Sequence, residues 1–141
     1  MPEPLSIAIS LIGLLMTCSK ISFALAEFIS NVKDAPKSAR AVLSTIEETK
    51  LALEAAQGLF DRLSAVPENR KILIQLDHIA ITLSSCILTH SELESLVCSN
   101  SFKGAKQKLK WPLMEKKVLR LLPRLESQKA SLALMVTVLQ W

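Results

Sequence analysis

The sequence predicts an all-α protein, and three observations favour an antiparallel four-helix bundle. Half of the 141 residues are hydrophobic and only three are glycine, a balance that suits helices better than sheets with tight turns. Apolar residues recur at alternating intervals of four and three positions, which places them along one side of a helix. Four segments of this kind are joined by short connections, as in a bundle. At this length we expect residues 1–141 to form a single domain.

The first predicted helix runs from about Leu5 to Val32 and carries very little charge. The run from Pro4 to Ser19 has no charged residue. It is nevertheless shorter and more polar than the roughly 20 apolar residues of a spanning helix, and it lacks the basic start and cleavage site of a secretory signal. We therefore expect a helix that is buried in the bundle at rest and becomes available under some conditions.

This first helix is predicted to have one broad apolar face and one thin face of small residues. Ile9, Ile12, Met16 and Phe23 are expected to widen its main apolar seam. A stripe of small or polar residues that includes Gly13 runs along the other side, and such stripes allow helices to approach closely in lipid. The main seam follows the heptad spacing and consists of Ile7, Leu11, Leu14, Cys18, Ile21, Leu25, Phe28 and Val32.

The second helix follows a turn that contains a proline. Asp34 is expected to cap this helix, with Pro36 in its first turn, because aspartate favours the capping position and proline the first helical residues. The apolar spacing then continues to about Ser64. The opposite face is charged, so this helix is predicted to be ordinarily amphipathic.

The third predicted helix covers about Arg70 to Val97. Besides its seam, it carries Ile74, Ile81 and Leu88 on other faces. A helix that is apolar on several sides is expected to be contacted on several sides, as at the centre of a bundle.

The fourth predicted helix runs from about Leu113 to Trp141, after a basic stretch that Trp111 and Pro112 close. Pro123 lies inside its pattern and is expected to kink or divide it, and division would give five helices. The apolar pattern is still running at the last residue. Because no helix-ending residue follows, we expect the chain to be the N-terminal module of a longer protein.

The side chains of catalytic and metal sites are scarce in this sequence. The three glycines stand far apart, which excludes a glycine-rich phosphate loop. His90 falls on an apolar seam and is predicted to be a hydrogen-bonded core residue, whereas His78 is predicted to lie on the surface. Cys18 and Cys86 are expected to be reduced core thiols, which fits a cytosolic protein. We predict no catalytic residue, no metal and no cofactor, and hence a protein that is not an enzyme.

The charge is divided unevenly along the chain. Residues 1–102 carry eight Lys and Arg against eleven Asp and Glu, a net charge of −3, whereas residues 103–141 carry nine against two, a net charge of +7. Such a segment favours an anionic surface, above all acidic lipid, unless it is only a solvated face. Nucleic acid is not an expected partner, because few aromatic residues accompany the lysines. The residues predicted to contact an anionic surface are Lys103, Lys106, Lys108, Lys110, Lys116, Lys117, Arg120 and Arg124.

The first helix admits two interpretations that the sequence leaves open. In one, its apolar face is simply part of the core. In the other, the helix leaves the bundle and enters a membrane or an oligomer, which its lack of charge allows. The residues predicted to act in membrane contact or oligomerisation are Leu5, Ile9, Ile12, Gly13, Leu14, Met16, Phe23 and Phe28.

Four stretches carry a resemblance to a known family. They are MPEPLSIAISLIGLL at residues 1–15, FISNVKDAP at 28–36, LKWPLMEKK at 109–117 and LESQKASLAL at 125–134. With them the chain resembles the fungal N-terminal domain of STAND (NLR-like) proteins, which also opens the azaphilone pigment cluster protein L family and is related in style to HeLo and HeLo-like domains. The resemblance implies a helical bundle of cell-death and incompatibility proteins, whose N-terminal helix targets membranes after oligomerisation. Gly13 stands alone where some HeLo-like members carry a glycine-rich zipper.

Together these observations predict a cytoplasmic signalling or effector bundle of a fungal NLR-like protein, recruited to the plasma membrane on activation. Its expected partners are a second copy of the chain, an anionic membrane or a helical protein. The competing hypothesis is an interaction or oligomerisation module that does not touch lipid. An enzyme is the third and most distant alternative.

Overall fold

A computed structural model describes the backbone of residues 4–64, 70–98 and 107–140, and the side chains of residues 5–62, 77–98, 111–138 and 140. This part of the chain forms four helices and no strand, which confirms the predicted all-α four-helix bundle. The third helix has the predicted bounds, the first agrees with its predicted bounds to within a residue, and the second ends at Ser64 as predicted. The helices are α1 (Pro4–Asn31), α2 (Lys37–Ser64), α3 (Arg70–Val97) and α4 (Gln107–Gln140).

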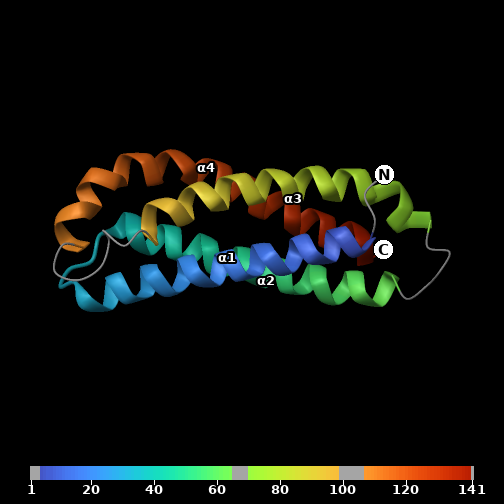
Figure 1. Ribbon diagram of the computed structural model, residues 1–141, viewed down its shortest axis with the longest axis horizontal. Helices are drawn as coiled ribbons and strands as arrows, with labels where there is room; N and C mark the ends of the chain where they lie inside the picture. The colour runs from blue at the N-terminus through green and yellow to red at the C-terminus, as the bar shows by residue number, and fades with distance from the viewer. Residues whose placement is uncertain (1–3, 65–69, 99–106, 141) are drawn as a thin grey trace.

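The bundle is elongated, and successive helices run in opposite directions (Figure 1). α1 packs against α2 and α3, and α4 packs against the same two helices. α1 and α4 therefore occupy diagonally opposite corners of the bundle. This placement determines which surfaces of the bundle a single partner can contact at the same time.

The core is built from the seams that the heptad spacing predicts. Almost every described residue of the predicted seams is buried, because their spacing places them on the inner side of each helix. The seam of α1 contributes a continuous row from Ile7 to Phe28. Several polar side chains are buried as well and need hydrogen-bond partners; they are Ser22, Thr45, Thr49, Thr89, His90 and Gln128.

The turn before α2 differs from the prediction that Asp34 caps this helix. α2 begins at Lys37, and the carbonyl oxygen of Pro36 accepts a hydrogen bond from the backbone nitrogen of Arg40 at 3.3 Å. Pro36 thus holds the capping position rather than the first turn. Asp34 adopts a left-handed conformation with φ of 59°, which aspartate tolerates better than most residues. It reverses the chain after α1 and does not cap α2.

α4 begins six residues earlier than predicted and is not divided. It runs from Gln107 through both Pro112 and Pro123, so the five-helix alternative is wrong for this segment. Figure 1 shows α4 as one bent helix, which fits the effect of an internal proline. The early start follows from Trp111, which is buried and stacks on Phe28 with ring centroids 5.4 Å apart.

Trp111 also joins three helices at one end of the bundle. Its indole Nε1 lies 3.0 Å from Ser38 Oγ of α2 and 3.0 Å from Glu115 Oε2 of α4. Ser38 Oγ donates to the same carboxylate oxygen at 2.7 Å. Because its ring packs on Phe28 of α1, this cluster ties α1, α2 and α4 together.

The prediction that α3 lies at the centre of the bundle is wrong. α3 packs mainly against α1 and α4 only. Ile81 and Leu88 remain exposed on its outer side, and the side chain of Ile74 lies outside the described residues. Apolar residues on the outer face of α3 therefore do not indicate that another helix covers that face.

Candidate functional site

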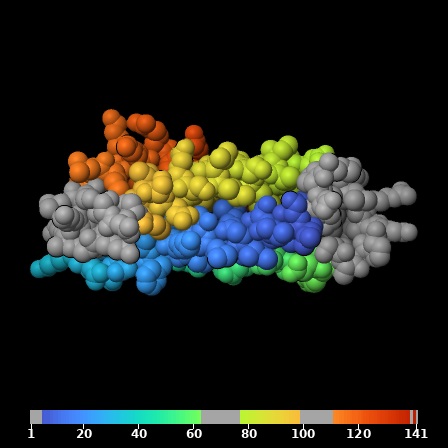
Figure 2. All heavy atoms as spheres, in the orientation of Figure 1, coloured from blue at the N-terminus to red at the C-terminus, as the bar shows by residue number. Residues whose placement is uncertain are grey.

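The outer side of α1 carries a row of large apolar side chains that face away from the bundle. We call this row the α1 stripe; its members are between 46% and 72% exposed. With 3.6 residues per turn, they fall within about 60° of the helix circumference, opposite the buried seam. In Figure 2, α1 lies beside α3 on the face shown. The α1 stripe consists of Leu5, Ile9, Ile12, Met16 and Phe23.

The α1 stripe corrects the predicted broad apolar face. Ile9, Ile12, Met16 and Phe23 do not widen the core seam but form a second seam on the other side. Their positions follow the intervals of a coiled coil, with Ser19 at the one polar position between Met16 and Phe23. α1 is therefore apolar on two opposite sides, one buried and one exposed.

The predicted membrane or oligomerisation residues are divided between these two sides. Leu14 and Phe28 belong to the core and are reached only if α1 leaves the bundle. Gly13 is exposed, and a Cβ added there would meet nothing within 4 Å, so packing inside the bundle does not require a glycine. By length and composition, α1 is the one described helix that qualifies as a membrane span, and a third of the qualifying window is buried in the bundle.

A shallow groove between α1 and α2 runs along one edge of the α1 stripe. Ile12 and Met16 of the stripe form part of its wall, and Glu54 and Gln57 of α2 form another part. Leu15, Ser19 and Lys20 complete its lining. Such a groove beside an apolar ridge is the shape that receives the side chains of another helix.

The predicted basic contact residues are described only in part. Lys103 and Lys106 lie outside the described residues, and the side chains of Lys108 and Lys110 lie outside them as well. The remaining four are exposed on α4, and we call them the α4 basic face: Lys116, Lys117, Arg120 and Arg124.

The acidic residues of α4 do not neutralise the α4 basic face, because both turn toward α2. Glu115 accepts hydrogen bonds from Ser38 and Trp111. Glu126 accepts from Thr45 Oγ1 at 2.6 Å and pairs with Lys129 at 2.8 Å, and the hydrogen bond from Lys129 lowers the pKa of this carboxyl group. The acidic charge of α4 is thus used to hold α2 and α4 together.

The two predicted surfaces do not lie side by side. α1 and α4 are at opposite corners of the bundle, so the thickness of the bundle separates the α1 stripe from the α4 basic face. One flat membrane cannot contact both at once in this arrangement. Contact of both surfaces with one membrane therefore requires α1 to leave the bundle, as the membrane interpretation of this helix expects.

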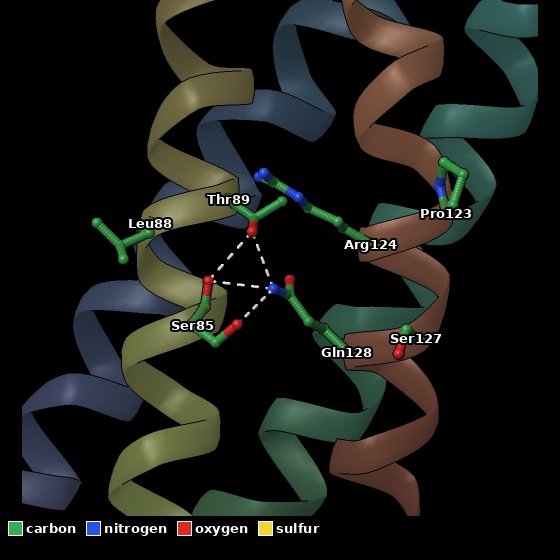
Figure 3. A pocket seen from close by; sticks show the side chains of 7 residues that line it. All are labelled: Ser85, Leu88, Thr89, Pro123, Arg124, Ser127 and Gln128. Carbon is green, nitrogen blue, oxygen red and sulfur yellow. Dashed lines mark hydrogen bonds between the residues drawn. The ribbon is translucent and has the colours of Figure 1, made fainter.

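A polar layer connects α3 and α4 beside an open groove (Figure 3). Gln128 Nε2 lies 2.9 Å from Ser85 Oγ, 2.9 Å from Thr89 Oγ1 and 3.1 Å from the Ser85 carbonyl oxygen. Gln128 Oε1 is buried and has no partner among the described atoms. Because the amide fits only where these hydroxyls lie, the layer fixes the register of α4 against α3.

The buried thiols are poor candidates for chemistry. Burial raises the pKa of Cys18 to about 12 and that of Cys86 to about 11. Both remain thiols at neutral pH, and the thiolate is the form that attacks or binds metal. In the described part of the chain, no three His, Cys, Asp or Glu side chains gather as a metal site. The predicted positions of both cysteines in the core are confirmed.

His90 is a buried core histidine, as predicted, and His78 is exposed. His90 Nδ1 lies 2.7 Å from the carbonyl oxygen of Cys86, so the proton of the neutral ring sits on Nδ1. Nε2 is buried and has no partner among the described atoms. Burial lowers the pKa of His90, because the charged ring would be desolvated and its second N–H would have no acceptor.

Because the pKa of His90 is lowered in the folded protein, we expect the bundle to lose stability as the pH falls below about 6.5, the ordinary pKa of histidine in an unfolded chain. Between this pH and the lower pKa of His90 in the folded protein, the unfolded chain binds a proton and the folded chain does not. The free energy of unfolding therefore decreases as the pH falls through this range. Urea unfolding at pH 7.5, 6.5 and 5.5 measures the effect. His90→Gln should flatten the dependence between these values and His78→Gln should not; equal slopes in all three proteins would contradict the assignment.

The sequence predicts the members of the α1 stripe as contact residues, but it does not predict that they form a separate seam on the outer side of α1. Leu5, Ile9, Ile12 and Met16 repeat the 4-3-4 spacing of the core seam, offset by half a turn. The Trp111 cluster left no comparable signal, because its partners on α2 and α1, Ser38 and Phe28, are 73 and 83 residues away in the sequence. Comparison of the chain with protein-family models, with curated proteins and with solved structures gives no match.

Proposed function

We propose that this protein is a self-assembling interaction module, without enzymatic activity, in which the α1 stripes of two copies pack against each other. The single observation that carries the proposal is the exposed heptad seam on the outer side of α1. A narrow apolar seam of this kind pairs with another helix by inserting its side chains into the facing grooves. In keeping with the resemblance to N-terminal domains of fungal NLR-like proteins, we place the module in the cytosol as an effector domain.

A second copy fits the α1 stripe because the stripe is nearly symmetric about Leu14, with Ser19 as the one polar position, opposite Ile9. In an antiparallel pair centred there, Leu5 faces Phe23 of the other copy and Ile12 faces Met16. Lys20, the one charged residue of α1 between Leu5 and Phe23, then lies about 18 Å along the axis from its equivalent, because twelve residues separate the two levels. A parallel pair would place the two lysines side by side, which is unfavourable. Closed two-fold pairs are also the commonest assemblies.

The free energy of core packing favours assembly through the exposed α1 stripe over a mechanism that first releases α1 from the bundle. Seven buried apolar side chains hold the inner side of α1, and burying a large apolar side chain contributes about 1.5 to 3 kcal/mol. Their sum, on the order of 10 to 20 kcal/mol, matches the whole stability of an ordinary domain. The stripe is available without that cost. The seven residues are Ile7, Leu11, Leu14, Cys18, Ile21, Leu25 and Phe28.

The experiment is the molar mass in solution across a concentration series. We expect the wild type to self-associate and Ile9→Glu to raise the dissociation constant by about 100-fold, because two charges per dimer would be buried in an apolar seam. Ile81→Glu is the matched control: Ile81 on α3 is 68% exposed, against 61% for Ile9, but it lies outside the stripe. A wild type that stays monomeric, or equal losses in both variants, would overturn the proposal.

Membrane contact through α1 is the second candidate function, and the length and apolar composition of α1 favour it. In that case wild-type protein should float with phosphatidylcholine vesicles and release their contents, and Ile9→Glu should abolish both effects. Stable oligomers that never float would leave assembly as the function of the α1 stripe.

A further inference from the structure

We propose that the α4 basic face binds the anionic headgroup layer of a membrane while the bundle stays closed. This surface is separate from the α1 stripe and does not depend on the self-assembly proposed above. Leu113, Lys117, Arg120 and Arg124 recur at intervals of four, three and four residues. They therefore line one side of α4 over about 16 Å, with Lys116 beside them.

The charges of the α4 basic face are available for a partner. Among the described residues, Lys116, Lys117 and Arg120 form no ion pair. Arg124 lies 3.8 Å from Glu92 of α3, and both side chains are 61% exposed, so solvent weakens that contact. Since Glu115 and Glu126 turn toward α2, this side of α4 carries four positive charges with one weak counter-charge.

The apolar residues beside these charges favour lipid over nucleic acid. Leu113 is 78% exposed, and an isolated exposed leucine beside lysines and arginines can enter the headgroup region while the cations meet the phosphates. Single-stranded nucleic acid is bound mainly by exposed aromatic side chains next to basic ones. The aromatic residue nearest in sequence, Trp111, is buried in the core.

The shape of the α4 basic face favours lipid over an acidic protein. Lys116, Lys117 and Arg120 lie on the exposed, rounded surface of one helix, and Arg124 lines the edge of the open groove between α3 and α4. A rigid partner would have to match these positions. The lipids of a membrane rearrange around a convex basic helix, and each basic residue near an anionic leaflet strengthens binding about fivefold. The bundle can dock without exposing its core.

Sedimentation of the full chain with vesicles tests this proposal. We expect binding to phosphatidylserine-containing vesicles, none to phosphatidylcholine alone, and weaker binding as salt rises. The double variant K117Q/R120Q should bind about 25-fold more weakly. The control K20Q/K33Q removes the same net charge from α1 and the turn after it and should bind within about twofold of the wild type, because only charges close to the lipid surface contribute.

Four results would overturn the proposal: no binding to phosphatidylserine vesicles, equal losses in the two double variants, binding to polyglutamate but not to vesicles, or a loss on Ile9→Glu that exceeds the loss on K117Q/R120Q. The last would place lipid contact on the α1 stripe. Because self-assembly is measured without lipid, the two proposals fail independently. Unchanged helical circular dichroism and melting temperature show that each variant is folded.

Discussion

Trp111→Ala is expected to destabilise the bundle by about 3 to 5 kcal/mol, the usual range for removing a buried tryptophan. Trp111 is 1% exposed and its ring stacks on Phe28. Its Nε1 donates hydrogen bonds to Ser38 and Glu115. The substitution opens a cavity where α1, α2 and α4 meet. For a domain of this size the melting temperature should fall by roughly 10 to 20 °C. Thermal unfolding followed by circular dichroism measures it.

Trp111→Phe separates packing from hydrogen bonding at this position. A phenylalanine can still stack on Phe28 but donates nothing to Ser38 or Glu115. We expect a loss of about 1 to 2 kcal/mol, since Ser38 and Glu115 keep their mutual hydrogen bond. If Trp111→Ala were no more destabilising than Leu113→Ala on the exposed side of α4, the three-helix cluster would not contribute to stability.

The fold could be predicted from the sequence because it depends on local periodicity. Heptad spacing predicts four helices, the buried seam of the first helix and the unusual core position of His90. Each of these predictions needs only the positions of neighbouring apolar residues along one helix. The start of α4 could not be found in this way, because the helix extends to Trp111 for a contact with Phe28, 83 residues earlier.

The candidate surfaces were predicted in residue type but not in arrangement. Periodicity places Leu14 in the main seam, but it does not show that Ile9 lies on the exposed opposite side instead of widening that seam. Likewise, the basic charge of residues 103–141 does not reveal that α4 lies diagonally opposite α1. The placement of helices around a bundle depends on contacts between distant residues. That is why the sequence does not show that the two candidate surfaces lie on different sides of the bundle.

Leu14→Ala and Met16→Ala should differ in their effect on stability by several kcal/mol, although the residues are two positions apart. Leu14 is 2% exposed and Met16 is 59% exposed. Removing the buried leucine side chain costs about 2 to 5 kcal/mol through lost burial and the cavity left behind. Removing the exposed methionine should change stability by less than about 0.5 kcal/mol. Urea unfolding at a concentration where the protein is monomeric measures both.

The same pair of variants separates the two sides of α1. Met16→Ala should weaken self-association without loosening the bundle, because Met16 belongs to the α1 stripe alone. Leu14→Ala should loosen the bundle and leave association of the folded fraction unchanged, because its side chain points inward. If α1 instead acted by leaving the bundle, Leu14→Ala would promote assembly or membrane entry by lowering the free energy of release. Unchanged association of folded Leu14→Ala thus indicates a fixed outer stripe, whereas increased assembly indicates a released helix.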